Sequence, residues 1–226
     1  MISSQRKKTS PRQGRRLRIV VTAGPTREYF DSVRFISNPS TGKMGYALAE
    51  AAAAAGHRVT LIRGPVELPA LKGVKTIRVT TAAQMATATK QAFPNSDAAI
   101  LTAAVCDYRP QRQGHRKLAK KHQAKRVILV PTEDIAAALG RVKAERITIA
   151  FAMEDHDGRA HAERKMRRKN CDAIVLNGPQ NVGADHCRVD FLEKGGRWQR
   201  WPIGTKRAIA KRLVKAVERL VDAAMS

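Results

Sequence analysis

Residues 20–45 read VVTAGPTREYFDSVRFISNPSTGKMG, and this stretch decides the fold. It begins with an apolar run typical of a buried strand and ends where a helix begins, at Lys43. Between them lies a long loop rich in Gly, Pro, Ser, Thr and Asn. Loops of this length are uncommon inside compact domains and are usually functional or disordered. Because regular elements flank it on both sides, we expect a functional, ligand-binding loop.

The rest of the chain alternates between two hydrophobic patterns. Strand-like runs are predicted at residues 18–22, 59–63, 75–79, 98–105, 127–130, 147–152 and 173–177. Helices are predicted at residues 43–55, 82–93, 133–141, 157–169 and 206–224. Strands that alternate with helices of this length form βαβ units. The sequence therefore predicts an α/β fold with a doubly wound, mostly parallel, Rossmann-like sheet.

A late segment departs from this alternation. Residues 188–193 and 197–201 flank a Lys-Gly-Gly turn, which predicts a β-hairpin extension. Phe191, Trp198 and Trp201 give this hairpin an apolar face. Two interpretations stay open at this point: the aromatic rings form an interface with another molecule, or they cover the domain's own sheet.

Length and composition fit one domain of ordinary size. The 226 residues contain 43% hydrophobic residues, and no apolar run is long enough to cross a bilayer. We expect a disordered basic tail at residues 1–16 and a single domain at residues 17–226. Cys106, Cys171 and Cys187 are odd in number and lack metal-ligand spacing. They suggest reduced thiols in a cytoplasmic protein without membrane contact.

The net charge of +24 is a large excess. Seven positive charges lie in the first 18 residues, which leaves +17 for the remainder. A nucleic-acid partner, a site that handles several phosphates, or a generally basic proteome would each explain the charge. Surfaces that bind RNA by stacking need aromatic residues, and only 4% of this chain is aromatic. Composition therefore disfavours a nucleic-acid partner.

Known phosphate-binding motifs do not fit the loop. A Walker A motif needs Gly five residues before Gly42, where Ser37 stands, and Ser or Thr where Met44 stands. The dinucleotide fingerprint also fails, because Gly24 lacks the second and third glycines. What is left is a loop that ends at a helix N-terminus, whose N–H groups suit anions. The alternative is that Ser40 and Thr41 merely cap the helix.

Several motifs together carry a family resemblance. They are VTAGPTRE…DSVRFISNPSTGKMG, TAAVCDYRP, KLAKK, FAMED and K-x-x-x-K-N-x-D-x-I-V-x-N. The chain resembles the phosphopantothenate–cysteine ligase (phosphopantothenoylcysteine synthetase) family from about Arg18 to its C-terminus. In many bacteria this ligase is the C-terminal half of a protein whose other half is a flavin-dependent decarboxylase. No such half precedes the first strand, so we expect a stand-alone ligase without FMN.

The resemblance implies a reaction in coenzyme A biosynthesis. CTP would activate 4'-phosphopantothenate as an acyl-cytidylate, L-cysteine would displace CMP, and Mg²⁺ would assist. It also implies a homodimer with sites near the subunit interface, in which the hairpin takes part. The alternative is a basic nucleic-acid-binding protein on a related scaffold without ligase activity. An NAD(P)-binding reductase is disfavoured by the missing glycine fingerprint.

The resemblance assigns catalytic roles to Asn38 and Lys117. A side-chain amide at Asn38 would donate to an oxygen that gains charge during transfer. Lys117, in a basic loop, would approach the nucleotide phosphates as part of a lid. The structural alternatives are an Asx turn for Asn38 and a solvated surface charge for Lys117.

The resemblance also implies a nucleotide-binding set. Its members are Leu101, Thr102, Ala103, Asp107, Lys117, Glu133, Asp134, Ile135, Ala136, Phe151, Lys165 and Lys169. Asp107 would accept a hydrogen bond from the nucleotide or hold the metal. Phe151 lies beside the base or belongs to the core. Lys165 and Lys169 share one helix face and repel each other unless an anion lies between them.

A substrate and phosphate loop completes the implied site, with Gly24, Thr26, Arg34, Ser37, Ser40, Thr41 and Gly42. Two positions depart from the family pattern. Glu133 stands where proline is usual, which adds a carboxylate near the phosphates. Cys187 stands where asparagine is usual, and this puts the contribution of its loop in doubt. Cys106 replaces a small residue, and we do not expect it to be a nucleophile.

Overall fold

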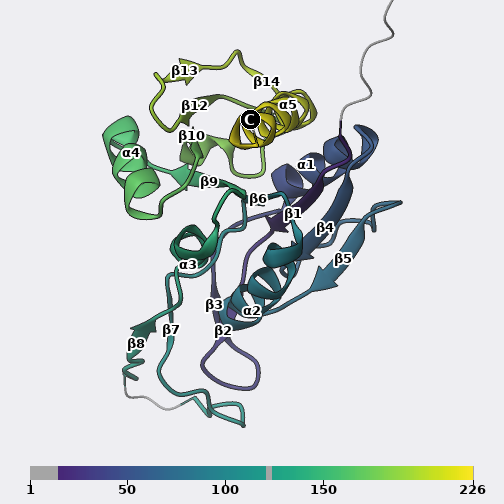
Figure 1. Cartoon of the computed structure of the whole chain (residues 1–226). Helices are drawn as coiled ribbons and strands as arrows, with labels where there is room; N and C mark the ends of the chain where they lie inside the picture. The colour runs from purple at the N-terminus through teal and green to yellow at the C-terminus, as the bar shows by residue number, and fades with distance from the viewer. Residues whose placement is uncertain (1–14, 121–123, 226) are drawn as a thin grey trace, which may run out of the picture.

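The computed structural model describes residues 15–120 and 124–225. Most of the predicted basic tail, residues 1–14, therefore lies outside the described residues. An eight-stranded sheet forms the centre of the molecule (Figure 1). Its strands, in spatial order, are β13 (Gln199–Arg200), β12 (Val189–Glu193), β10 (Ala173–Asn177), β9 (Ile147–Met153), β6 (Ala98–Leu101), β1 (Arg18–Ala23), β4 (Arg58–Arg63) and β5 (Lys75–Arg78). The six strands from β10 to β5 are parallel, which confirms the predicted fold class.

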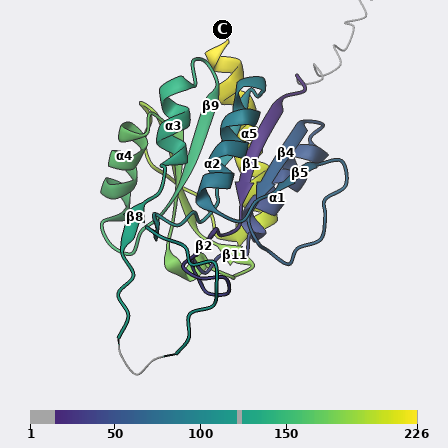
Figure 2. The same cartoon turned by 90° about the horizontal axis from the view of Figure 1, so that it is seen from below.

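Helices cover both faces of this sheet, as Figures 1 and 2 show. On one face lie α1 (Lys43–Ala54) and α5 (Lys206–Ala224). On the other lie α2 (Ala82–Ala92), α3 (Ile135–Val142) and α4 (Gly158–Arg168). The inner strands are buried almost throughout because they are covered on both sides. Two 3₁₀ turns, η1 (Phe93–Asn95) and η2 (Pro179–Asn181), complete the helical elements of the described chain.

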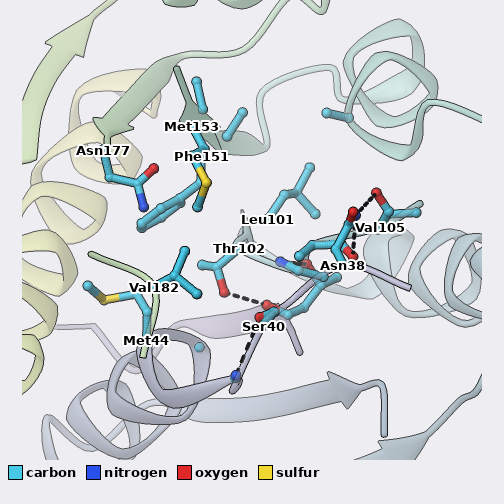
Figure 3. A pocket seen from close by; sticks show the side chains of 18 of the residues that line it. Asn38, Ser40, Met44, Leu101, Thr102, Val105, Phe151, Met153, Asn177 and Val182 are labelled. Atoms are coloured by element: carbon cyan, nitrogen blue, oxygen red, sulfur yellow. Dashed lines mark hydrogen bonds between the residues drawn. The ribbon is translucent and has the colours of Figure 1, made fainter. Parts of the chain in front are cut away.

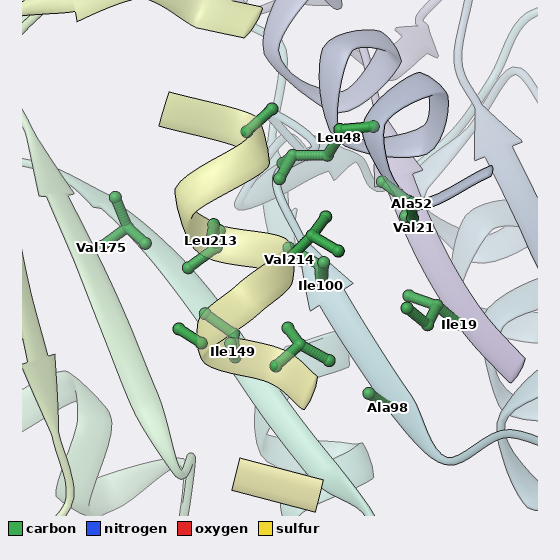
Figure 4. Packing of buried hydrophobic residues seen from close by; sticks show 14 of the residues in the cluster. Ile19, Val21, Leu48, Ala52, Ala98, Ile100, Ile149, Val175, Leu213 and Val214 are labelled. Carbon is green, nitrogen blue, oxygen red and sulfur yellow. The ribbon is translucent and has the colours of Figure 1, made fainter. Parts of the chain in front are cut away.

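The packing of α5 holds one face of the sheet. Leu213 and Val214 are buried at 0% and 3% exposure. They lie against Ile100 and Ile149 of the sheet and against Leu48 of α1 (Figure 4). The predicted helical spacing of residues 206–224 is therefore confirmed, and its apolar stripe faces the core.

The order of the strands creates a crevice beside β1. From β1 the chain proceeds outward to β4 and β5, and then returns to β6 on the other side of β1. At such a switch point the loops at the carboxyl ends of two neighbouring strands run apart, and ligands bind between them. Here the hydroxyl of Thr102 donates to the carbonyl of Thr22 at 2.8 Å, and the N–H of Ala104 donates to the carbonyl of Gly24 at 2.9 Å.

Two sequence-based boundaries in this region were wrong. The predicted strand at residues 98–105 ends at Leu101, because the Thr22 side chain replaces a main-chain partner at Ala103. The loop at residues 24–42 contains a short hairpin of β2 (Arg27–Tyr29) and β3 (Phe35–Ser37), where no regular structure was expected.

The predicted strand at residues 127–130 was also misplaced. It forms β8 (Leu129–Pro131), which pairs with β7 (Tyr108–Pro110) in an antiparallel arm outside the central sheet. Figures 1 and 2 both show this arm extending away from the sheet. Apolar composition alone does not distinguish a central strand from one in a separate arm, and Ile128 and Leu129 are 66% and 44% exposed.

The late hairpin predicted at residues 188–201 is present, and its two strands are β12 and β13. Phe191 and Trp201 are 1% and 2% exposed, and their ring centroids lie 4.9 Å apart. These two rings cover the domain's own sheet, as one of the two interpretations predicted. Trp198 is partly buried, and the Arg159 guanidinium lies 5.7 Å from its ring. Beside the hairpin, β11 (His186–Cys187) pairs with β14 (Gly204–Thr205).

Gly45 lets α1 approach the end of β1. A Cβ at this position would lie 2.4 Å from the Cβ of Ala23 and 2.8 Å from Oγ1 of Thr102. We expect Gly45→Ala to lower the free energy of unfolding by about 2–3 kcal/mol, because an overpacked core must shift its backbone. Urea unfolding measures this change. Gly204→Ala is the control, since its Cβ would meet no atom closer than 3.6 Å; equal stability of the two variants would contradict the prediction.

Candidate active site

A cavity of about 550 Å³ lies at the carboxyl ends of β6, β9 and β10, beside the N-termini of α1 and α3. Its volume lies within the range of small-molecule sites. Fifteen of the residues predicted from the sequence line it: Asn38, Ser40, Thr41, Gly42, Leu101, Thr102, Ala103, Asp107, Glu133, Asp134, Ile135, Ala136, Phe151, Lys165 and Lys169. The fold thus brings together segments that lie more than a hundred residues apart in the sequence.

The N-terminus of α1 enters the cavity without a side-chain cap. Gly42 is the N-cap residue, with a left-handed φ of 74°, and no side chain among the described residues accepts a capping hydrogen bond here. The interpretation of Ser40 and Thr41 as capping residues is therefore wrong. Lys43, Met44 and Gly45 follow in the first turn and line the cavity. Their N–H groups have no intrahelical partner, so this end of the helix suits an anion.

Asn38 ties the loop to the segment after β6. Its side-chain Nδ2 donates to the carbonyls of Ala104 and Val105, at 3.2 and 3.1 Å (Figure 3). The residue is exposed and lies on the wall of the cavity. Its amide therefore positions the loop at residues 24–42 against the switch point.

Four lysines line the cavity, and each has a partner. Lys165 contacts Glu154 at 2.5 Å, Lys169 contacts Asp134 at 3.2 Å, and Lys43 contacts Asp185 at 2.7 Å. The predicted repulsion between Lys165 and Lys169 is thus relieved by separate carboxylates rather than by one shared anion. These ion pairs hold the three ammonium groups in position at the cavity wall.

The fourth lysine, Lys206, is the first residue of α5. Its ammonium donates to the carbonyl of Asn181 at 3.2 Å and also to the carbonyl of Ala184. Burial lowers the pKa of Lys206, and the neighbouring charge of Lys43 lowers it further. These two lysines fasten the loop at residues 181–185 beside the N-terminus of α1.

Three carboxylates line the cavity as well. Asp134 is the N-cap of α3 and accepts from the N–H of Ala137 at 3.1 Å, so the helix begins at Ile135 rather than at Glu133 as predicted. Both oxygens of Glu133 contact Lys90, at 2.9 and 2.7 Å, which offsets the charge that this departure adds. Within the described chain, Asp107 has no ion pair.

Apolar side chains form the remaining wall. Phe151 is partly buried, packs against the core and also lines the cavity, so its predicted place beside a base stays a prediction. In Figure 3, the side chains of Leu101, Phe151 and Met153 border the same cavity as those of Met44 and Val182. A flat apolar surface next to lysines and free N–H groups fits a ligand that combines a ring with phosphates.

Comparison with known proteins identifies the family. Residues 14–220 match the family described as the DNA/pantothenate metabolism flavoprotein C-terminal domain. The chain belongs to this family. The match covers most of the chain and confirms the resemblance carried by the motifs.

Two curated relatives show the extent of the similarity. The coenzyme A biosynthesis bifunctional protein CoaBC of Bacillus subtilis (strain 168) is 40% identical over 217 residues, which cover 94% of this chain and 53% of that protein. A protein named cysteine/cysteine sulfinic acid decarboxylase, from an unknown prokaryotic organism, is 41% identical over 217 residues, which cover 93% of this chain and 60% of that protein. The chain thus spans little more than half the length of these relatives.

Solved structures share the fold. The C-terminal domain of CoaBC aligns with a TM-score of 0.82 and 36% identity, covering 94% of this chain and 100% of that one. The Cab2 mutant H337A in complex with phosphopantothenate-cysteine aligns with a TM-score of 0.75, covering 93% and 89%. Its 17% identity shows a common fold alone.

Five predicted site residues lie outside the cavity lining: Gly24, Thr26, Arg34, Ser37 and Lys117. Thr26 is fully buried, and its hydroxyl accepts from the N–H of Cys106 at 3.0 Å. Ser37 donates to the carbonyl of Thr26 at 2.7 Å. Gly24 has a left-handed φ of 76°. These three residues shape the loop behind the cavity wall rather than the wall itself.

Asp31 connects Arg34 with the loop that carries Lys117. Its buried carboxylate accepts from the N–H groups of Val33, Arg34 and Leu118, at 2.8, 2.7 and 3.2 Å. The Arg34 guanidinium contacts the same carboxylate at 3.2 Å and the carbonyl of Leu118 at 3.2 Å. Lys117 is therefore placed next to the β2–β3 turn, and its predicted role at the nucleotide stays a prediction.

Sequence reasoning missed much of the lining. The omitted residues are Thr22, Pro39, Lys43, Met44, Gly45, Ala104, Val105, Thr132, Ala150, Ala152, Met153, Asn177, Asn181, Val182, Gly183, Cys187, Val189 and Lys206. Lys43, Met44 and Gly45 stand inside the quoted motif and were recognisable from it. Lys206 carries no local signal, because α5 contains basic residues along its whole exposed face.

The three cysteines are free and buried. Burial raises the pKa of Cys106 and Cys187, and it raises the pKa of Cys171 to about 11. A thiol kept protonated is a poor nucleophile, in agreement with the expectation for Cys106. Cys187 is 2% exposed and lines the cavity beside Lys206.

Among the described residues, the His, Cys, Asp and Glu side chains form no group of three or more that is suited to a metal ion. The helices in this part of the chain are too short or too polar to cross a membrane.

The hydrogen bonds of Asp31 to Arg34 and to Leu118 in the loop of the arm depend on pH. Burial acts to raise the pKa of Asp31, but the hydrogen bonds from the N–H groups of Arg34, Val33 and Leu118 and the Arg34 charge lower it below its ordinary 3.8. A carboxylate with a depressed pKa stabilises the fold above its unfolded pKa, and this contribution is lost as the pH falls through the folded pKa. We expect Asp31→Asn to lower the free energy of unfolding at neutral pH, and to differ progressively less from the parent below pH 3.8.

Urea unfolding at neutral pH and at about pH 3 measures this difference. Glu145→Gln is the control, since Glu145 is exposed and its side chain has no ion pair or hydrogen bond among the described residues. If the difference in unfolding free energy between Asp31→Asn and the parent stayed constant across this pH range, the charged carboxylate would not be what stabilises this contact.

Proposed function

We propose that the protein is a ligase of coenzyme A biosynthesis that joins 4'-phosphopantothenate to L-cysteine with CTP. The observation that carries the proposal is the cavity at the switch point, where an uncapped helix N-terminus, a side-chain amide and four lysines surround one space. The family match and the coenzyme A relatives support it. So does the name of the Cab2 complex, which holds phosphopantothenate-cysteine in a protein of the same fold.

The nucleotide would lie across the ends of β6 and β9. Phe151 offers an apolar surface for the base, and the main chain at Thr102 and Ala103 lies beside it. Lys165 and Lys169 would turn from Glu154 and Asp134 to the phosphates. Lys117 would reach them only after a movement of its loop. The choice of CTP over ATP rests on the family resemblance rather than on a contact.

Two displacements complete the proposed reaction. A carboxylate oxygen of phosphopantothenate attacks the α-phosphorus of CTP, and the bond to pyrophosphate breaks. The amine of cysteine then attacks the acyl carbon of the acyl-cytidylate, loses a proton, and expels CMP as the amide forms. Both steps need positioning and neutralisation of developing charge rather than a protein nucleophile. The N–H groups at the start of α1 would stabilise the oxygens that gain charge, and the amide of Asn38 would join them after releasing the carbonyl of Ala104 or Val105.

Magnesium fits this site only together with the nucleotide. Mg²⁺ commonly binds one or two carboxylates plus substrate phosphates. Asp107 is a lining carboxylate without an ion pair among the described residues, and it would be the protein ligand. When bound, the ion would neutralise phosphate charge during transfer. No flavin takes part in the proposed reaction.

The arm supports a homodimer as the proposed assembly. Of the large apolar residues exposed in the described chain, six lie on the arm or on the β2–β3 hairpin: Val33, Phe35, Tyr108, Val127, Ile128 and Leu129. An exposed cluster of this kind marks an interaction surface. Phe191 and Trp201 are buried within the subunit, so the arm is a better candidate for the interface than the late hairpin.

Pyrophosphate release tests the activity directly. We expect release that requires CTP and phosphopantothenate together, that reaches one equivalent per site without cysteine, and that becomes continuous when cysteine is added. Mass spectrometry should then find the amide product. Absence of pyrophosphate release under all conditions would contradict the proposal.

Asn38 provides the sharpest test of the site. We expect Asn38→Ala to lower kcat by about 100-fold, the size of effect seen when one donor to a developing oxyanion is removed. Asn38→Asp keeps the shape of the side chain but lacks the NH₂ donor, so it should lose as much. Steady-state kinetics measures both variants. Full activity in Asn38→Asp would show that the donor is not required.

The dimer is tested on the arm. We expect Ile128→Lys to raise the dissociation constant of the dimer by at least about tenfold, because a charge would enter an apolar interface. Val142→Lys, at an equally exposed apolar position on α3, should leave association unchanged. Sedimentation equilibrium measures both. Identical association of the two variants would exclude the arm as the interface.

A further inference from the structure

A second cavity of about 550 Å³ lies at the opposite end of the sheet, where its parallel strands begin. It is formed by the N-terminal ends of β1, β4 and β5 and by the last turns of α2. Its lining residues are Arg16, Arg18, Ile19, Val20, Arg58, Val59, Thr60, Gly73, Lys75, Ile77, Ala88, Gln91, Ala92, Asn95 and Ser96. Four of them are cationic and none is acidic.

The strand register places three of these cations on one face. Arg18 lies directly beside Arg58, and Lys75 lies directly beside Thr60 on the next strand. Side chains two residues apart on a strand share a face, so Arg58 and Thr60 point the same way. Ile62, two residues further along β4, belongs to the core under α2 and α3. Arg18, Arg58 and Lys75 therefore stand side by side on the α2 face.

The three cations are exposed, so water and salt screen part of their mutual repulsion, and a bound anion would relieve the remainder. Like charges on directly opposed strand positions repel each other. Of the four lining cations, Arg18 alone has an ion pair among the described residues, with Asp97 at 3.4 Å. Asp97 is shared with Arg15, also at 3.4 Å. Arg16, Arg58 and Lys75 carry charges that no described carboxylate offsets.

The shape favours a small molecule over a nucleic acid. Apolar residues of the strands and of α2 line the cavity between the cations, among them Ile77 and Ala88. The side chains of Gln91 and Asn95 add neutral hydrogen-bonding groups. None of its lining residues in the described part of the chain is aromatic, whereas single-stranded nucleic acids are bound by stacking on aromatic side chains.

We propose that this cavity is a second, separate site that binds a phosphorylated small molecule of nucleotide size. Arg16, Arg18, Arg58 and Lys75 would hold its phosphates, and the apolar lining would cover its remaining part. The site lies at the N-terminal ends of the strands, so a ligand bound there does not overlap with a ligand in the first cavity, at their carboxyl ends. The inference does not rest on the ligase activity, which pyrophosphate release tests independently.

Titration with inorganic triphosphate and with ATP, followed by amide NMR, tests the proposal. We expect both probes to shift the amide signals of Thr60, Gln91 and Asn95, with ATP binding at least as tightly because its adenosine covers apolar surface. The double variant Arg58→Gln/Lys75→Gln should weaken binding at these amides by about tenfold or more. Lys75→Gln alone should show a smaller loss in the same direction.

Arg78→Gln is the matched control. Arg78 lies on the same strand as Lys75 but an odd number of residues away, so it points to the opposite face. The Arg78→Gln variant loses one positive charge, and binding measured at Thr60, Gln91 and Asn95 should change by less than about twofold. Signals of Thr102 and Ala103 report the first cavity and should respond alike in all variants.

Three results would overturn the proposal. The first is the absence of shifts at Thr60, Gln91 and Asn95 with either probe. The second is an equal loss in Arg78→Gln and in the double variant, which would reveal only the general positive field. The third is a response of these amides to a short single-stranded RNA but not to triphosphate or ATP, because the occupant would then be a nucleic acid.

Discussion

The contact between α1 and the end of β1 is the constraint on which the site depends. Gly45 has no side chain, and this allows the first turn of α1 to approach Ala23 and Thr102 closely. The approach brings the uncapped N–H groups of the helix to the point where β1 and β6 diverge. An anion bound there meets the helix dipole, the switch-point crevice and the Asn38 loop together. The same contact places the loop at residues 24–42 and the strand ends around one cavity.

A second layer of interactions holds the charged groups in place before a ligand arrives. The lysines of the cavity are held by Asp185, Glu154, Asp134 and by main-chain carbonyls. Exposed ion pairs contribute little to stability, so their value here is positional. If Lys43, Lys165 or Lys169 exchanged its carboxylate for another anion, it would lose little further side-chain entropy. A site arranged in this way suits chemistry that depends on positioning rather than on a protein nucleophile.

The sequence predicted the parts that carry local signals. The alternation of strands and helices gave the fold class, and the loop motif gave Asn38 and Gly42 because it is contiguous. Other features depend on pairing between distant segments. The run that forms β8 looks like any buried strand until its partner β7 is known. The contact of Lys43 with Asp185 spans 142 residues, and the alignment of Arg18 with Arg58 requires the strand register. Such features appear only once the chain is folded.

A crystal structure with CTP and 4'-phosphopantothenate, without cysteine, tests the central claim most directly. The account predicts continuous density for an acyl-cytidylate in the cavity between α1 and the ends of β6 and β9. Its base should lie beside Phe151 and its phosphate within hydrogen-bond distance of the first N–H groups of α1. A nucleotide bound elsewhere, with this cavity empty, would contradict the account.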